Sequence, residues 1–142
     1  MTTIRQILQE KGGEVSTISH DATVFDAIKM MADRNIGALV VMEGRKVVGL
    51  ITERTYAREV VLKGRTSPTT PVGEVMETDV PYAQPEQSVE ECMAVMTKTR
   101  LRHMPVFDRG ELAGLISMGD LVHSIIDGHE FTIEQLLHYI RT

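Results

Sequence analysis

The stretch Gly49-Leu50-Ile51-Thr52 returns 65 positions later as Gly114-Leu115-Ile116-Ser117. Further pairs at the same offset, with no gap, are Val24/Val89, Asp26/Glu91, Met31/Met96 and Val41/Val106. Each copy is too short to bury a core alone, so the repeat predicts two similar units packed into one body. Two such units facing each other would create a cleft between them, and we expect the functional site there.

Composition narrows the class of protein. The chain has 142 residues and 42% apolar content, and it contains no apolar run near the roughly 20 residues that span a bilayer. Its start, residues 1–8, lacks the basic and long apolar stretches of a secretion signal. The net charge of −5 disfavours broad nucleic-acid binding, and the single cysteine, Cys92, fits a reducing cytosol. We therefore expect a cytoplasmic protein that binds neither membranes nor nucleic acid.

Hydrophobic periodicity predicts the order strand, helix, strand, strand, helix, twice. In the first copy we expect strands at 15–18, 38–42 and 47–51, and helices at 24–34 and 52–62. In the second copy we expect strands at 80–83, 104–107 and 112–116, and helices at 89–99 and 118–126. Breaker residues mark 63–71 as a linker, 72–76 reads as a short helical turn, and 131–140 has a helical apolar face.

This order resembles a tandem pair of cystathionine β-synthase (CBS) domains, a Bateman module. The resemblance covers roughly residues 15–126, and its diagnostic pieces are Arg102-His103-Met104-Pro105-Val106 and Gly114-Leu115-Ile116-Ser117-Met118-Gly119-Asp120. With no catalytic, channel or transporter domain attached, the chain resembles the small bacterial stand-alone members. The resemblance implies an α/β (α+β) fold of two β-α-β-β-α units, 1–71 and 72–142, packed through their sheets with pseudo-two-fold symmetry.

Ser117 and Asp120 are the principal candidate site residues. Ser117 stands where a strand ends and a helix begins, and helix N-termini attract anions such as phosphate. Asp120, one turn later, could accept two hydrogen bonds from a ribose diol. An ordinary capped helix explains the same two residues. The resemblance favours the ligand, because the matching residues of nucleotide-binding CBS pairs contact ribose and phosphate.

The first copy departs from this pattern. It has Thr52 in place of Ser117, but Thr55 stands where the family motif expects an aspartate. A threonine makes one short hydroxyl contact and carries no charge, so we expect weaker ribose binding there and two non-equivalent sites.

Two arginines follow Thr52 on one predicted helix face. Arg54 and Arg58 are four residues apart, and guanidinium groups suit a phosphate clamp. Ion pairs with Glu53 and Glu59 are the alternative on a solvated surface. Both readings stay open.

The resemblance also places Arg102 and His103 near the phosphate of a bound nucleotide, beside Arg100 in a compact positive cluster. A lone histidine near a strand is otherwise a structural hydrogen-bonding residue. The family's apolar slot for the base falls on Ala22, Ile36, Gly37, Ala38 and Ile116. These same residues could simply belong to the core.

The sequence suggests no catalytic or metal site. His123 and Asp127 are four apart on a predicted helix, which falls short of a zinc pattern and fits a solvated face. Cys92 lies on the apolar face with Val89 and Met96, as a buried, inert cysteine does. No acid, base or nucleophile is arranged for catalysis.

The sequence and the resemblance together predict a non-catalytic regulatory sensor. It would bind an adenosine nucleotide (AMP, ADP, ATP or NAD(H)) in the cleft and signal by a conformational change to an unidentified partner protein. We expect a homodimer formed through the helix faces Val24–Met31 or Val89–Met96. The alternative is a homodimeric adaptor that binds no nucleotide.

Overall fold

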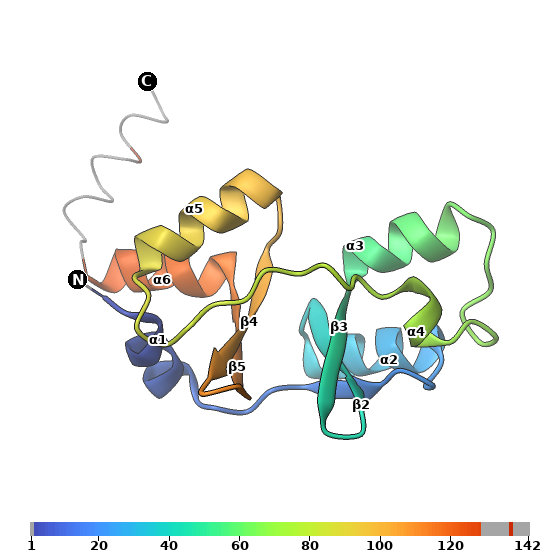
Figure 1. The fold of residues 1–142 in the computed structure, drawn as a ribbon. Helices are drawn as coiled ribbons and strands as arrows, with labels where there is room; N and C mark the ends of the chain where they lie inside the picture. The colour runs from blue at the N-terminus through green and yellow to red at the C-terminus, as the bar shows by residue number, and fades with distance from the viewer. Residues whose placement is uncertain (1, 129–136, 138–142) are drawn as a thin grey trace. The chain divides into compact units, whose positions relative to one another are not determined.

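The computed structural model describes residues 2–128 and 137, and it divides the chain into two compact units (Figure 1). One unit is residues 14–80, and the other combines residues 1–13 with 81 onward. The predicted helix at 131–140 lies outside the described residues except at position 137.

The 14–80 unit contains a three-stranded sheet in the order β1 (Thr17–Ser19), β2 (Ala38–Glu43) and β3 (Lys46–Thr52). Strand β1 runs parallel to β2, and β3 runs antiparallel to it. Its helices are α2 (Val24–Arg34), α3 (Glu53–Thr55), the π-helix η1 (Tyr56–Val61) and α4 (Val72–Val75).

The second unit contains the antiparallel hairpin β4 (His103–Asp108) and β5 (Glu111–Ser117). Its helices are α1 (Ile4–Lys11), α5 (Val89–Thr99) and α6 (Met118–Gly128). The predicted strand at 80–83 is wrong: only Ala83 bridges the hairpin, donating to the carbonyl of Pro105 at 2.9 Å. Pro81 and Pro85 flank Ala83, and prolines lack the N–H that would extend the pairing.

The two copies of the 65-residue repeat also share details of their backbone conformation. Helices α2 and α5 both end on a left-handed residue, Asn35 with φ 53° and Arg100 with φ 59°. Both hairpins carry their register irregularity at matching places, 41/42 and 106/107. The mixed helix and strand content with two small sheets confirms the predicted α/β (α+β) class.

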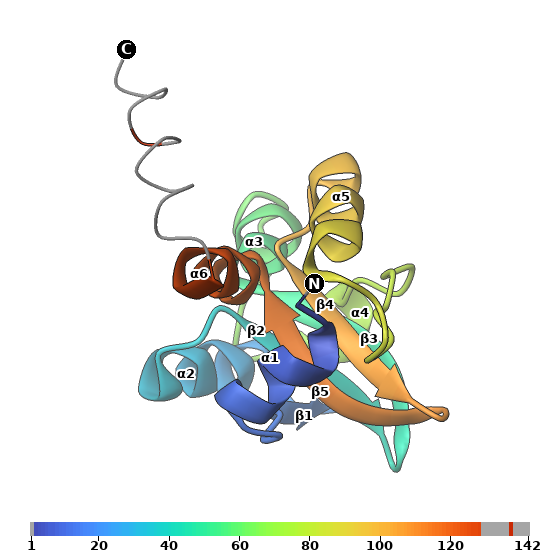
Figure 2. The ribbon, with the colours of Figure 1, turned by 90° about the vertical axis from the view of Figure 1, so that its left-hand side faces the viewer.

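The short segment before each repeat docks on the other repeat. The N–H of Val72 at the start of α4 donates to the carbonyl of Ala22 at 2.8 Å, and that of Ile4 at the start of α1 donates to Gln87 at 2.9 Å. We call residues 2–13 and 70–80 the flanking segments. Figure 2 shows α1 beside the β4–β5 hairpin and α6.

The two hydrophobic cores reflect this docking of each flanking segment on the repeat that does not follow it. Ile4 and Ile7 belong to the core that contains Val89, Met96 and Leu121, among others. Val72 and Val75 join a core formed with Ile18, Val24, Ala27, Met31, Leu39, Val41, Ile51 and Val60. The compact units therefore differ from the predicted halves 1–71 and 72–142, because the apolar face of each flanking segment is buried against the repeat that does not follow it.

The apolar stripes expected to form a dimer interface are interior instead. Val24 is 0% exposed and Met31 is 3% exposed, and Val89 and Met96 are each 1% exposed. These stripes hold α2 and α5 on their own units, so the predicted dimer faces are wrong. Among residues 2–128, no helix is long and apolar enough to cross a membrane.

Candidate functional site

Ser117 and Asp120 form a reciprocal cap at the start of α6. The N–H of Asp120 donates to Ser117 Oγ at 3.0 Å, and the N–H of Ser117 donates to Asp120 Oδ2 at 2.8 Å. These bonds satisfy backbone donors that the first helical turn leaves unpaired. The two residues thus act as a helix cap, and the same arrangement presents a half-buried carboxylate at a helix N-terminus.

Lys11, the last residue of α1, also binds this carboxylate. Its ammonium donates to Asp120 Oδ2 at 2.7 Å and to the main-chain carbonyl of Leu115 at 2.7 Å. The side chain of Lys11 is 39% exposed and that of Asp120 is 24% exposed, so solvent reaches the pair. The candidate ribose-binding group is therefore already occupied by a cation.

The pKa of Asp120 reflects opposing effects. Burial, the largest effect, raises the pKa of the carboxyl, but the hydrogen bonds from Lys11 and Ser117 and the charge of Lys11 together outweigh it. The net result is a pKa below the ordinary value of 3.8. Asp120 is therefore a carboxylate at neutral pH and an acceptor for hydroxyl donors.

The strand pairing brings Arg102 and His103 to the same place. His103 lies opposite Ser117 in the hairpin, and the N–H of Met118 donates to the carbonyl of Arg102 at 2.8 Å. Arg102 is exposed and His103 is partly buried. The structure thus groups Arg102, His103, Ser117 and Asp120 at one end of one sheet.

The first copy has the same cap but a closed site. Thr52 and Thr55 exchange backbone-to-hydroxyl bonds at 3.1 and 3.2 Å, as Ser117 and Asp120 do. Thr55 is 2% exposed, and its hydroxyl donates to Glu77 Oε1 at 3.3 Å. Burial of Thr55 leaves little access to its hydroxyl from solvent, and weaker ribose binding at this position stays a prediction.

The two arginines near Thr52 lie in different helical segments. Arg54 is in α3 and Arg58 is in η1, and both are exposed. Glu59, a suggested partner for the arginines, instead binds Lys63 at 2.6 Å. Of the two carboxylates suggested as partners for these arginines, Glu59 is therefore paired with a lysine.

The predicted base slot divides between the two units. Ile116 is 0% exposed and lies in the core of its unit, so its side chain is a core residue. Ala22 and Ile36 pack partly buried against the core of the 14–80 unit. Gly37 and Ala38 lie beside Thr52, because the N–H of Glu53 donates to the carbonyl of Gly37 at 3.1 Å and Ala38 pairs with Thr52. Their role toward a ligand remains a prediction.

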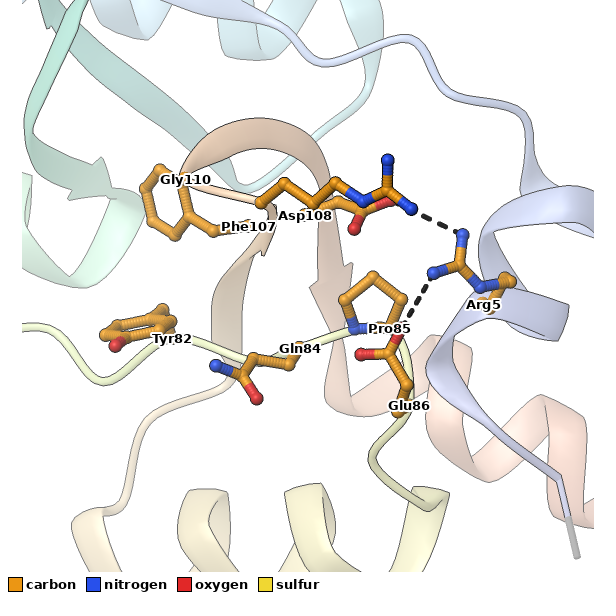
Figure 3. Close-up of a pocket in the computed structure, with 9 residues that line it drawn as sticks. Arg5, Tyr82, Gln84, Pro85, Glu86, Phe107, Asp108 and Gly110 are labelled. Atoms are coloured by element: carbon orange, nitrogen blue, oxygen red, sulfur yellow. Dashed lines mark hydrogen bonds and ion pairs between the residues drawn. The ribbon is translucent and has the colours of Figure 1, made fainter.

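A separate pocket of about 400 Å³ lies at the hairpin end of the same unit (Figure 3). Arg5 closes one side of it by ion pairs with Glu86 at 2.8 Å and Asp108 at 3.4 Å. Tyr82 and Phe107 stand on the opposite side, with ring centroids 5.5 Å apart and nearly perpendicular planes. Both carboxylates that line the pocket pair with Arg5. These ion pairs hold the start of α1 against the rest of its unit.

The remaining candidates are structural. Cys92 is buried, and desolvation raises its pKa to about 11, so the thiolate nucleophile is scarce. His123 and Asp127 lie 3.2 Å apart on the exposed face of α6. Within residues 2–128 and 137, no cluster of three potential metal-ligating side chains occurs.

Sequence reasoning missed Lys11, which is 109 positions away from Asp120. A second, shorter repeat marks only the segment in which Lys11 lies. Ile4, Ile7 and Leu8 match Val72, Val75 and Met76 at an offset of 68, not 65. That match identifies α1 and α4 as equivalent segments, but only the structure shows that the end of α1 lies near the end of β5.

Comparisons with known proteins agree with this architecture. A family model for the CBS domain matches residues 4–62 and 72–127. A candidate signal-transduction protein with CBS domains from Burkholderia ambifaria MC40-6 is 50% identical, with a TM-score of 0.88 over 93% of this chain and 99% of that chain. The mitochondrial CBS domain-containing protein CBSX3 of Arabidopsis thaliana is 37% identical over 99% of this chain and 72% of its own length. A hexameric CBS-CP12 protein from bloom-forming cyanobacteria is 29% identical, with a TM-score of 0.76 over 86% of this chain and 71% of that chain. With two matches that together span most of its length, the chain belongs to the CBS-domain family.

Proposed function

We propose that this protein is a non-catalytic sensor that binds an adenosine nucleotide at the N-terminal end of α6. Asp120 receives the ribose hydroxyls, and the start of α6 with Ser117, Arg102 and His103 faces the phosphate. Adenosine ligands are common among CBS domains. The nucleotide is AMP, ADP, ATP or NAD(H), and its binding alters how the protein engages a partner.

The ionised, partly exposed carboxylate of Asp120 is the observation that carries this proposal. It stands beside an α-helix N-terminus, where the helix dipole favours an anion. Arg102 and His103 add basic groups at the same end of the sheet. Ribose and phosphate require this combination of acceptor and positive potential.

The second copy is the stronger of the two positions. Thr55 replaces the carboxylate in the first copy, is buried, and donates its hydroxyl to Glu77. Arg54 and Arg58 nevertheless expose two guanidinium groups near Thr52, which suits a phosphate more than a ribose. We therefore assign high-affinity binding to Asp120 alone.

The competing function is an adaptor that assembles without a nucleotide. Exposed apolar side chains favour it in a specific place: Val122 and Ile126 of α6 are 41% and 40% exposed and lie one turn apart. A cytoplasmic homodimer stays our prediction for the assembly and location. The hexameric and mitochondrial relatives show that other assemblies and compartments occur in the family.

Calorimetric titration of the purified protein with AMP, ATP and NADH tests the proposal. Asp120→Ala should weaken binding by about 1.5–3 kcal/mol, the scale of a hydrogen bond to a charged group. Thr55→Ala is the matched control at the equivalent position, and its affinity should stay within about twofold of the parent. No heat with any of the three ligands would leave the adaptor as the better account, and equal affinity in the Asp120→Ala protein would overturn the assignment of the ribose to Asp120.

A further inference from the structure

We propose that Lys11 is a latch on Asp120, which a ribose must open in order to bind. The proposal rests on the function proposed above and adds its regulation. It assigns to Lys11 control of affinity at the site, and it links the site to the C-terminal end of α1.

The hydrogen bonds at Asp120 carry the argument. Oδ2 accepts both the Lys11 ammonium at 2.7 Å and the Ser117 N–H at 2.8 Å. A carboxylate oxygen has two acceptor positions, so Oδ2 is saturated. A ribose diol places one hydroxyl on each carboxylate oxygen, and it therefore needs one of these two donors to leave. The Ser117 bond is built into the first turn of α6, whereas Lys11 is a flexible side chain, so Lys11 is the donor that leaves.

In the other repeat, a backbone N–H takes the place of the Lys11 ammonium. The carbonyl of Leu50, which matches that of Leu115, accepts the backbone N–H of Glu77 at 2.8 Å. There α4 ends at Val75 and the chain runs extended past Leu50. Helix α1 instead continues to Lys11, whose ammonium bonds the Leu115 carbonyl. A side-chain ammonium thus occupies the carbonyl that a backbone N–H occupies in the other unit. A side-chain hydrogen bond can break without unfolding of the backbone.

The far end of α1 stays fixed when the latch opens. Arg5 holds it through Glu86 and Asp108 (Figure 3), and Ile4 and Ile7 are buried. Only the last turn of α1 would be released. Gly12, with φ 91°, follows Lys11 at once, and the 14–80 unit begins two residues later. Release of Lys11 therefore changes the constraint on the chain that joins the two units.

If Lys11 is a latch, removing it should strengthen nucleotide binding, although most lysine losses weaken the binding of an anion. Lys11→Met removes a cation from a chain of net charge −5, which by itself weakens binding of an anion. A lysine that contacted the phosphate would likewise weaken binding when removed. A competing lysine does the opposite, because its loss frees Asp120 before the ligand arrives.

Calorimetry with AMP and 2′-deoxy-AMP on the wild type and Lys11→Met tests the latch. AMP should bind the variant roughly three- to tenfold more tightly, the scale of a partly exposed charge-assisted pair. 2′-Deoxy-AMP, with one hydroxyl fewer for Asp120, should gain less. Lys29→Met removes a lysine from an exposed ion pair with Asp33 and should leave both affinities unchanged. Lys11→Arg keeps the cation and should stay close to the wild type.

Hydrogen exchange provides a second measurement on the unaltered chain. Saturation with AMP should speed amide exchange at the last turn of α1 and at residues 12–13, and it should leave the start of α1 protected. If the wild type binds AMP and Lys11→Met binds it equally or more weakly, the latch role of Lys11 is wrong. The proposed nucleotide-binding function is then unaffected. Silence of both proteins toward AMP, ATP and NADH overturns the sensor, and the latch with it. Binding by Lys11→Met alone supports both.

Discussion

Leu8 packs directly over Gly114. A Cβ added at Gly114 would lie 2.5 Å from Leu8 Cδ2, which is closer than two carbons can approach. At the matching glycine, a Cβ on Gly49 would lie 2.7 Å from the backbone oxygen of Glu77 and 2.8 Å from Met76 Sδ. Each glycine thus allows a flanking segment to lie against a strand of the repeat on which it docks.

Alanine at these glycines should destabilise the protein unequally. We expect Gly49→Ala to lower the free energy of unfolding by about 3 kcal/mol and Gly114→Ala by about 1 kcal/mol, the two ends of the range for overpacking. The difference arises because Gly49 faces a backbone carbonyl, whereas Gly114 faces the end of a side chain that can rotate. Urea unfolding of both variants measures the two values.

A double variant separates the clash from the loss of glycine itself. Leu8→Ala makes room for the new methyl group, so Gly114→Ala should cost less in that background than in the wild type. Additive losses would show that the Leu8 contact is not the cause.

Exchange of the flanking segments between units can be tested residue by residue. Ile4→Ala creates a cavity in the core shared with α5 and the β4–β5 hairpin, at a cost of about 2–5 kcal/mol. Hydrogen exchange should therefore speed up in α5, β4 and β5. Val72→Ala, in the other flanking segment, should speed up exchange in α2, β2 and β3. The reverse pattern, with each variant loosening its neighbour in sequence, would contradict the packing described above.

Stability should depend on pH through Asp120. Its pKa in the folded protein lies below the ordinary value of 3.8, so folding favours the ionised form. The resulting stabilisation is complete above the unfolded pKa and is lost as pH falls through the lower, folded pKa. Asp120→Asn lacks this contribution, which we expect to be on the order of 1 kcal/mol or less for a solvent-accessible pair.

Urea unfolding of the wild type and Asp120→Asn between about pH 2.5 and pH 7 measures this contribution. The two stability curves should differ most near neutral pH and approach each other in acid. Curves that stay parallel down to the lowest pH would mean that Asp120 gains nothing from Lys11 and Ser117.

Cys92 should be unreactive in the folded protein. Its thiol is buried, and burial raises its pKa to about 11, so little thiolate is present at neutral pH. Reaction with a chromogenic disulfide should be slow in buffer and complete within minutes in guanidinium chloride. Rapid labelling of the native protein would indicate an opening of α5 that the structure does not show.

The repeat made much of the fold predictable. Val24 and Val89 begin matching helices and Thr52 and Ser117 cap matching ones, because apolar spacing and capping chemistry are local properties of the chain. The failed strand at 80–83 has a local cause as well. Its apolar residues favour a strand, but the neighbouring prolines leave only Ala83 able to pair on both sides.

The remaining errors concern tertiary contacts. The stripes of α2 and α5 were predicted to form a dimer interface, and the packed structure assigns them to the cores. The exchange of α1 and α4 depends on contacts between distant parts of the chain. Lys11 shares no local pattern with Asp120, so its ion pair could not be read from either residue's neighbours.

The docking of α1 constrains the order in which the parts of this chain can fold during synthesis. The ribosome makes α1 before the residues that bury Ile4 and Ile7, which extend to α6. The 14–80 unit has all its parts once residue 80 has emerged, so it can fold while α1 still waits in solvent. In a nascent chain, Ile4 and Ile7 of α1 therefore stay exposed until α6 has been made, and a stall before α6 would leave this helix available to chaperones or proteases.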